Sequence, residues 1–435
     1  MPAELRDAVS GRAWLQALLD AERALAAAEA RVGVIPADAA EAIAAACRAE
    51  RFDAEAIGHQ GRAAGNPVEP LVRTLTDAVE GKAAGYVHWG ATSQDILDTA
   101  AMLVSRGALD LIVHAVAGVA DECARLAETH RSTPIAGRTL LQQAVPTTFG
   151  LKAAGWLVAV IEARRGLVRV REQGLAVQLG GAAGTLGALG EAGPEVLSAF
   201  AEELGLQEPV VPWHTNRVRI AELGSALEVA AGACAKIGLD VALLSQSEVG
   251  EATEAEAGVS STMPQKRNPV GSALAVACAR QVHAQAAVLT AALPQEHERA
   301  LGGWHSEWPA LTGALAYTGG AAAAAHRALE GLQVDPERMG ANLQLSDGAV
   351  MSERVAFLLA ERLGRGDAQA LVAEAAARSQ ASGRGLRDEL LNDARVDVAP
   401  EELEAAFDPS TYLGSAEAFV DRALGAYRDE LGGGA

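Results

Sequence analysis

The sequence predicts an all-α protein. Half of its residues are hydrophobic, much of that share is alanine, and only 4% are aromatic. Alanine has the highest helix propensity of the amino acids and is poor in strands. Several long segments also repeat apolar residues at helical spacing. We therefore expect a bundle of long helices, and because one chain does not bury every apolar stripe, we expect a homo-oligomer.

The first predicted helices are short and are interrupted by proline or glycine. Residues 10–32 have leucines at helical spacing, and Pro36 precedes a second helix over 37–48. Asp53 is a suitable cap for a third helix, and Pro67 stands near the start of the next.

Residues 86–100 read Y-V-H-W-G-A-T-S-Q-D-I-L-D-T-A and open a long helix that ends near Thr129. Gly90 breaks the preceding pattern, and Thr92 or Ser93 is suited to cap the helix. A helix start next to hydroxyls and glycine offers free N–H groups that favour a carboxylate. A simple helix cap accounts for the same residues, so both interpretations stay open at this point.

The next segment, 130–150, is predicted to be an irregular connection, because Pro134, Gly137 and Pro146 interrupt any regular pattern. Its polar residues are Arg138, Thr139, Gln142 and Gln143. A helix then runs to about residue 173. The glycine-rich stretch 180–190 lacks the strand–loop–helix context of a nucleotide-binding turn, so we predict a flexible loop or a short hairpin.

The clearest helix follows P-W-H-T-N-R at 212–217. Its apolar residues alternate at intervals of three and four, which predicts a long, nearly straight helix in a left-handed bundle. They are Ile220, Leu223, Leu227, Ala230, Cys234, Ile237, Val241 and Leu244. An acidic run follows, and further helices are predicted over 270–292 and 308–332. After Pro336, shorter helices over 347–363, 367–382 and 400–406 predict a small C-terminal domain.

Residues 256–271 read E-A-G-V-S-S-T-M-P-Q-K-R-N-P-V-G between two long helices. Gly258 permits backbone angles that other residues resist, and Pro264 and Pro269 exclude an uninterrupted helix. Its serines, Lys266, Arg267 and an asparagine suit an anionic substrate. A solvated surface turn is the alternative interpretation.

Charge and cysteine spacing exclude several classes of function. The net charge of −20 argues against a nucleic-acid or anionic-membrane partner, although a local basic pocket remains compatible with it. The four cysteines lack metal-ligand spacing, so we expect buried free thiols, no metal and no cofactor. The N-terminal residues contain no apolar signal core, and no uncharged apolar run of about 18 residues occurs. We expect no membrane span and a cytoplasmic location.

Three motifs, at 88–95, 137–146 and 260–269, together resemble the three signature regions of the fumarase/aspartase superfamily. Their order, their spacing and the long helices between them fit over essentially the whole chain. Within the superfamily, the chain resembles most the branch of bacterial cycloisomerases that act on carboxylated muconates. The resemblance lies in the first two motifs, in P-W-H-T at 212–215 and in H-E-R-A-L-G-G-W-H-S-E-W at 297–308.

The resemblance implies a three-domain all-α fold with a central long-helix bundle, divided at 1–105, 106–340 and 341–435. It implies a homotetramer whose bundles merge into a twenty-helix core. Each active site would then take its three motifs from three different subunits.

One position departs from the superfamily pattern. Many of its lyases have a histidine after G-R-T that protonates the leaving group, and Leu140 stands there. A defective lyase is one interpretation; a reaction that needs no acid is the other. In cycloisomerisation a substrate carboxylate attacks an alkene carbon and closes a lactone, and a carboxylate is already ionised at neutral pH. The resemblance therefore implies lactone closure of a carboxymuconate, a tricarboxylate, in aromatic-compound degradation, and an apolar Leu140 would help to shape the pocket and exclude water.

By the same resemblance, Ser260 takes the position of the superfamily's catalytic serine, and Lys266 and backbone N–H groups would stabilise its alkoxide. The residues that we expect to bind substrate are His88, Thr92, Ser93, Gln94, Thr139, Gln142, Asn216, Ser261, Met263, Asn268 and Arg299. Weaker candidates are His214, Arg217 and His305.

Two alternatives remain open. A C–N lyase such as adenylosuccinate lyase shares the superfamily motifs, but an amine leaving group needs the acid that Leu140 does not supply. A non-enzymatic homologue, as in the lens crystallins of this superfamily, is the other. The presence of Ser260, Lys266 and Asn268 argues against it.

Overall fold

The structure is a computed structural model that describes residues 2–256, 258–259 and 262–432, and it confirms the all-α class. The helices are α1 (Ala3–Ala8), α2 (Gly11–Val32), α3 (Ala37–Ala46), α4 (Ala54–Ala64), α5 (Val68–Ala78), α6 (Ser93–Thr129), α7 (Phe149–Arg169), α8 (Gly193–Leu204), α9 (Val218–Leu244), α10 (Val270–Ala291), α11 (Gly303–Leu329), α12 (Pro336–Gln344), α13 (Ser352–Leu363), α14 (Arg365–Ser382), α15 (Leu386–Leu391), α16 (Pro400–Ala406) and α17 (Ala416–Leu431). The strands are β1 (Pro134–Thr139), β2 (Gln142–Thr148), β3 (Ala252–Thr253), β4 (Gly258–Val259), β5 (Arg267–Asn268) and β6 (Gln333–Val334).

The chain divides into two compact units, and the long helices contribute to both. Unit 1 contains the described residues of 1–116, 162–235 and 274–324. Unit 2 contains those of 117–161, 236–273 and 325–435. Each unit is described separately below.

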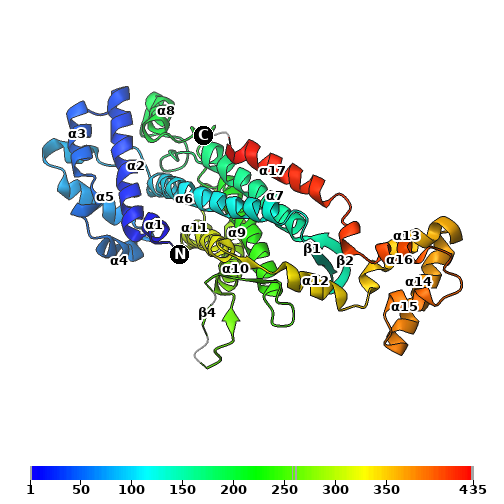
Figure 1. The fold of residues 1–435 in the computed structure, drawn as a ribbon. Helices are drawn as coiled ribbons and strands as arrows, with labels where there is room; N and C mark the ends of the chain where they lie inside the picture. The colour runs from blue at the N-terminus through cyan, green and yellow to red at the C-terminus, as the bar shows by residue number, and fades with distance from the viewer. Residues whose placement is uncertain (1, 257, 260–261, 433–435) are drawn as a thin grey trace. The chain divides into compact units, whose positions relative to one another are not determined.

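In unit 1, α2 packs against α3 and α8, as Figure 1 shows. The Ser10 side chain accepts the N–H of Ala13 at the start of α2, and Gly33 ends the helix in the left-handed region. Asp53 accepts the N–H groups of Glu55 and Ala56, which confirms the cap predicted for α4.

The helices α6, α9, α10 and α11 pack closely within unit 1. All eight apolar residues of the alternating pattern in α9 are buried, which confirms the predicted seam. Small residues allow the close approach: a Cβ on Gly224 of α9 would lie 2.9 Å from Leu289 of α10. Helix α11 begins at Gly303, earlier than predicted, and it accommodates Pro309. The apolar pattern missed this first turn because Glu307 is polar and yet buried.

The connection predicted to be irregular is instead a hairpin in unit 2. Strands β1 and β2 pair antiparallel, with a bulge between Ala136 and Arg138. Proline is tolerated because both strands of a two-stranded sheet are edges. Helix α12 packs against β1. The prediction was wrong because proline disrupts a central strand but not an edge strand, and both strands of this sheet are edges.

The short helices α13 to α16, drawn in yellow-orange to orange-red in Figure 1, gather in unit 2 around their own core. The buried residues of that core include Val355, Leu359, Leu371, Leu386 and Leu390. The predicted helix over 400–406 matches α16, and those over 347–363 and 367–382 correspond to α13 and α14.

Among the described helices, α6 is long and apolar enough to cross a membrane by length and composition, although the sequence analysis expected no span. Of its most apolar window, 44% is buried inside the protein. The core helix of a soluble protein meets the same criterion. The start of α6 also carries Asp95 and Asp98, which are buried in unit 1.

Candidate active site

The first motif is organised around Asp95, which is fully buried in unit 1. Its carboxylate accepts the backbone N–H of Thr92 at 2.9 Å, and its own N–H donates to the Thr92 carbonyl. It also accepts the N–H groups of Gly180 and Gly181, each at 2.9 Å, and lies 2.6 Å from His214 Nε2. Asp95 therefore holds the helix start, the glycine-rich loop and the P-W-H-T segment together. Asp95 was not among the predicted site residues, although Thr92-x-x-Asp95 has the spacing of a capping box.

Gln94 links the first motif to Arg299. Its amide nitrogen donates to Asp98 at 3.1 Å and to the His214 carbonyl at 2.9 Å. Its amide oxygen accepts Arg299 Nε at 3.2 Å. The Nη2 of Arg299 is buried and has no partner among the described residues. A buried guanidinium donor of this kind is suited to hold a carboxylate.

Arg217 is the centre of a buried ion network next to Gln94, and its side chain is 1% exposed. Arg217 donates to both oxygens of Asp98, at 2.7 and 3.0 Å, and to Glu307 at 2.6 Å. Trp304 Nε1 also donates to Asp98. Burial alone would lower the pKa of Arg217, but the two carboxylates raise it above its ordinary value. Burial also raises the pKa of Glu307. The network fixes Asp98, which in turn holds Gln94.

His88 precedes the helix start with a left-handed backbone, at φ 60°. Its Nδ1 lies 2.7 Å from Glu22 Oε1 on α2. Burial alone would lower the pKa of His88, but the charge of Glu22, the hydrogen bond to it and the charge of Asp95 together raise the pKa. His88 is thus held toward its positively charged form.

Asn216 has a local role in the described chain. Its side chain is exposed, and its Oδ1 accepts the N–H of Val218 at 3.4 Å at the start of α9. The sequence-predicted residues in unit 1 are His88, Thr92, Ser93, Gln94, Asn216 and Arg299.

The second motif forms the hairpin of unit 2. Thr139 and Gln142 face each other at its end and are exposed. The two tip residues, Leu140 and Leu141, have φ 49° and 66° and are 98% and 72% exposed. Two-residue turns with this backbone favour Asn-Gly, so two leucines there are strained. Leu140 therefore encloses no pocket within the described chain; a role as a pocket wall requires a surface from another subunit.

The acidic run after α9 supports both the hairpin and the next helix. Arg138 donates to both oxygens of buried Glu251, at 2.8 and 2.7 Å, and Asn342 donates to the same carboxylate. Buried Glu254 accepts the N–H groups of Gly271 and Ser272 at 2.9 and 2.8 Å, at the start of α10. Negative charge is favoured at a helix N-terminus.

The third motif forms a small arm in which β4 pairs with β5. The Lys266 N–H donates to the Met263 carbonyl at 3.0 Å. Lys266 and Met263 are exposed and Asn268 is half-buried; Ser260 and Ser261 lie outside the described residues. Gly258 lies in β4, and its lack of a Cβ matters there, because a Cβ would lie 2.5 Å from Val270. Thr139, Gln142, Met263, Lys266 and Asn268 all belong to unit 2.

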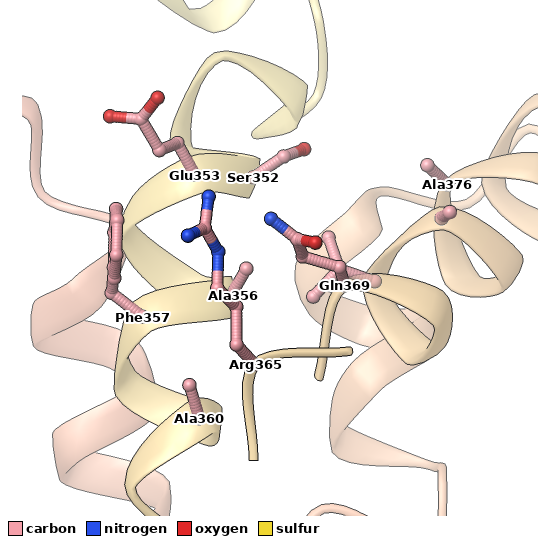
Figure 2. A pocket seen from close by; sticks show the side chains of 10 residues that line it. Ser352, Glu353, Ala356, Phe357, Ala360, Arg365, Gln369 and Ala376 are labelled. Carbon is pink, nitrogen blue, oxygen red and sulfur yellow. The ribbon is translucent and has the colours of Figure 1, made fainter. Parts of the chain in front are cut away.

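A cavity of about 380 Å³ lies between α13 and α14 (Figure 2). None of the sequence-predicted site residues lines it. Its labelled lining residues are Ser352, Glu353, Ala356, Phe357, Ala360, Arg365, Gln369 and Ala376. Across the described ranges, no group of three or more His, Cys, Asp or Glu residues is arranged to hold a metal ion.

Glu29 is a second buried acid on α2, two helical turns after Glu22. It is 0% exposed, and both carboxyl oxygens lack partners in the described part of the chain. Burial, and then the charge of Glu22, raise the pKa of Glu29 from 4.5 to about 9. Glu29 is therefore uncharged in the folded protein at neutral pH.

Replacing Glu29 with glutamine is expected to stabilise the protein at pH 7 by about 3 kcal/mol. Unfolded wild type loses the Glu29 proton above about pH 4.5, whereas the folded protein keeps it until about pH 9. Wild-type stability therefore falls as pH rises through this window, and the glutamine variant avoids that loss. Urea unfolding at pH 4 and pH 7 measures the difference, which should be close to zero at pH 4. An equal difference at both pH values would contradict the assignment.

Comparison with known proteins gives a consistent result over the whole chain. A family model described as "Lyase" matches residues 3–284. A second, described as "Adenylosuccinate lyase C-terminus", matches residues 348–423.

Among the relatives, 3-carboxy-cis,cis-muconate cycloisomerase of Bradyrhizobium diazoefficiens is 46% identical over 97% of this chain and 95% of its own. Nitrosuccinate lyase of Streptomyces davaonensis is 47% identical over 96% of this chain and 91% of its own. The crystal structure of 3-carboxy-cis,cis-muconate lactonizing enzyme from Pseudomonas putida superposes with a TM-score of 0.92 at 43% identity, covering 98% of this chain and 97% of that one.

Proposed function

The chain belongs to the fumarase/aspartase superfamily of lyases, and we propose that it converts 3-carboxy-cis,cis-muconate to 4-carboxymuconolactone as a cycloisomerase. Relatives and a solved structure of that activity match it over nearly its full length. The observation that favours this reaction over acid-dependent lyase reactions is Leu140, which stands where many lyases of the superfamily have an acid–base histidine. A reaction whose attacking and leaving group is a carboxylate needs no acid there.

The reaction is an isomerisation, so every atom of the substrate is kept. One substrate carboxylate oxygen forms a bond to an alkene carbon, and the π electrons move to the neighbouring carbon. A second carboxylate stabilises that carbanion, which then takes one proton. In the reverse direction the proton leaves first and the lactone C–O bond breaks.

Ser260 supplies that proton and removes it in reverse, by its position in the third motif. Lys266 and backbone N–H groups stabilise the serine alkoxide, because a serine hydroxyl is otherwise a poor acid at neutral pH. Asn268 helps to hold the carboxylate that takes up the negative charge. Ser261 and Met263 contact the substrate next to these residues.

The residues of unit 1 bind the other carboxylates. Arg299 presents the buried Nη2 group that has no protein partner in the described residues. His88 is favoured in its charged form. Thr92, Ser93 and Gln94 stand at the start of α6, where free N–H groups favour an anion. Thr139 and Gln142 on the hairpin complete the set, with Asn216 beside His214.

A homotetramer accounts for the exposed hairpin tip. Leucines at φ above zero are strained, and such strain persists where a surrounding structure holds it. A neighbouring subunit would cover Leu140 and Leu141 and let the leucine exclude water from that subunit's site. In this arrangement three subunits contribute the three motifs to each site, and the bundles merge into a twenty-helix core. We also propose that the protein has three domains, at 1–105, 106–340 and 341–435, and that it is cytoplasmic.

Nitrosuccinate cleavage is a second candidate, because a relative of that name is 47% identical over almost the same length. Elimination from nitrosuccinate would release nitrite, an anion that also leaves without an acid. Leu140 is therefore compatible with both reactions. It disfavours adenylosuccinate cleavage, despite the match of the C-terminal region.

An assay on purified protein separates these functions. We expect the ultraviolet absorbance of 3-carboxy-cis,cis-muconate to decrease, with the lactone identified by mass spectrometry and NMR. Parallel reactions with nitrosuccinate, adenylosuccinate and argininosuccinate measure release of nitrite or fumarate. Faster nitrite release than lactone formation would favour the second candidate. Inactivity on all four acids would favour a non-enzymatic homologue.

A further inference from the structure

Glu22 lies in the apolar seam of α2, between Leu18 and Leu25 at helical spacing. Its side chain is 1% exposed. A carboxylate in such a position is costly unless a partner compensates it. One oxygen lies 2.7 Å from His88 Nδ1, and the other is buried without a partner in the residues described. The hydrogen bond to His88 is therefore the interaction that holds this acid.

The charged groups that act on His88 are Glu22 from α2 and Asp95 from α6. Asp95 is occupied by backbone N–H groups and by His214, whereas Glu22 contacts the imidazole directly. When Nδ1 faces a carboxylate, Nε2 is left to face away from it. The left-handed backbone of His88 sets the position from which its side chain projects, and the contact with Glu22 sets the orientation of the imidazole ring.

We propose that Glu22 is a positioning residue that orients His88 and keeps its imidazole protonated, so that Nε2–H binds a carboxylate of the substrate. The inference rests on the proposed function only for the identity of that carboxylate. A carboxylate that orients a histidine and sets its protonation state is a general device of enzyme sites.

The test compares Glu22→Gln with Glu29→Gln. Glutamine at 22 keeps an oxygen that accepts the Nδ1–H but removes the charge. Glu29 lies on the same helix, is as deeply buried and does not contact His88, so its glutamine variant is the matched control. NMR titration of the histidine Cε1–H signals, with His88 assigned by its loss in His88→Asn, should show a lower pKa of His88 in Glu22→Gln. In Glu29→Gln, the pKa of His88 should stay raised, as in the wild type.

Steady-state kinetics give the second measurement. In Glu22→Gln, KM for the tricarboxylate should rise by about tenfold at pH 8, as expected when a hydrogen bond to a charged group is weakened. It should rise less at pH 6, where a larger fraction of the imidazole is protonated even without the charge of Glu22, and kcat should change less than KM. A KM increase of equal size at both pH values would indicate a merely structural role and overturn the proposal.

The titration also separates this inference from the proposed function. If the wild type forms no lactone, the proposed reaction fails while the pKa of His88 still tests the role of Glu22. If Glu22→Gln does not fold, the wild type alone decides: a His88 pKa at or below that of an ordinary histidine overturns the inference.

Discussion

Replacing Ser260 with alanine is expected to lower kcat by about 10²–10⁴-fold, the usual contribution of one positioned general acid–base group. Lactone closure needs one proton on carbon, and with Leu140 in the hairpin no second acid is available at the superfamily's usual position. The substrate carboxylate attacks without a general base, so this proton transfer is the step that needs an acid–base group. Steady-state absorbance kinetics at saturating 3-carboxy-cis,cis-muconate measure the loss.

Ser261→Ala is the matched control, because it removes a neighbouring hydroxyl of the same motif. We expect it to raise KM more than it lowers kcat, since Ser261 is assigned to binding. Size-exclusion chromatography should show the same oligomer for both variants and the wild type. A Ser260→Ala variant with near-normal kcat would exclude this serine as the proton donor.

Replacing Arg217 with methionine is expected to lower the free energy of unfolding by about 3–5 kcal/mol at pH 7, the cost of leaving buried carboxylates without their partner. Arg217 forms ion pairs with both Asp98 and Glu307. Burial already raises the pKa of Glu307 in the presence of Arg217, and without that guanidinium the pKa of Glu307 would rise further. Acids with raised pKa in the folded state cost stability as pH rises above their unfolded pKa. The defect should therefore shrink at pH 5.

Arg219→Met serves as the control for the loss of a guanidinium. Arg219 also stacks on Trp213, with its guanidinium carbon 4.9 Å from the ring centroid compared with 4.7 Å for Arg217, but it donates to the Gly174 carbonyl. We expect a loss of about 1 kcal/mol or less. Urea unfolding at one protein concentration measures both variants. Equal losses at pH 5 and pH 7 for Arg217→Met would contradict the explanation by unpaired carboxylates.

The helices were largely predictable because their signals are local. The alternating apolar pattern of α9 predicted its buried seam residue by residue, and Asp53 predicted the start of α4. The superfamily was predictable as well, since each of its three motifs is a continuous stretch of sequence. The hairpin of β1 and β2 was missed, because a local pattern does not show that the sheet has two strands and leaves its prolines at edges.

The sequence by itself determined the all-α class, the superfamily and the departure at Leu140, because residue type and spacing carry all three. It did not determine which acids are structural. Glu251 and Glu254 belong to an acidic run and Asp95 to the first motif, yet each is buried and accepts hydrogen bonds from donors distant in sequence. Tertiary structure decided this, since burial makes a carboxylate depend on partners that no spacing rule identifies. It also decided that Leu140, at the tip of its hairpin, is exposed and not enclosed by the described residues of its own chain.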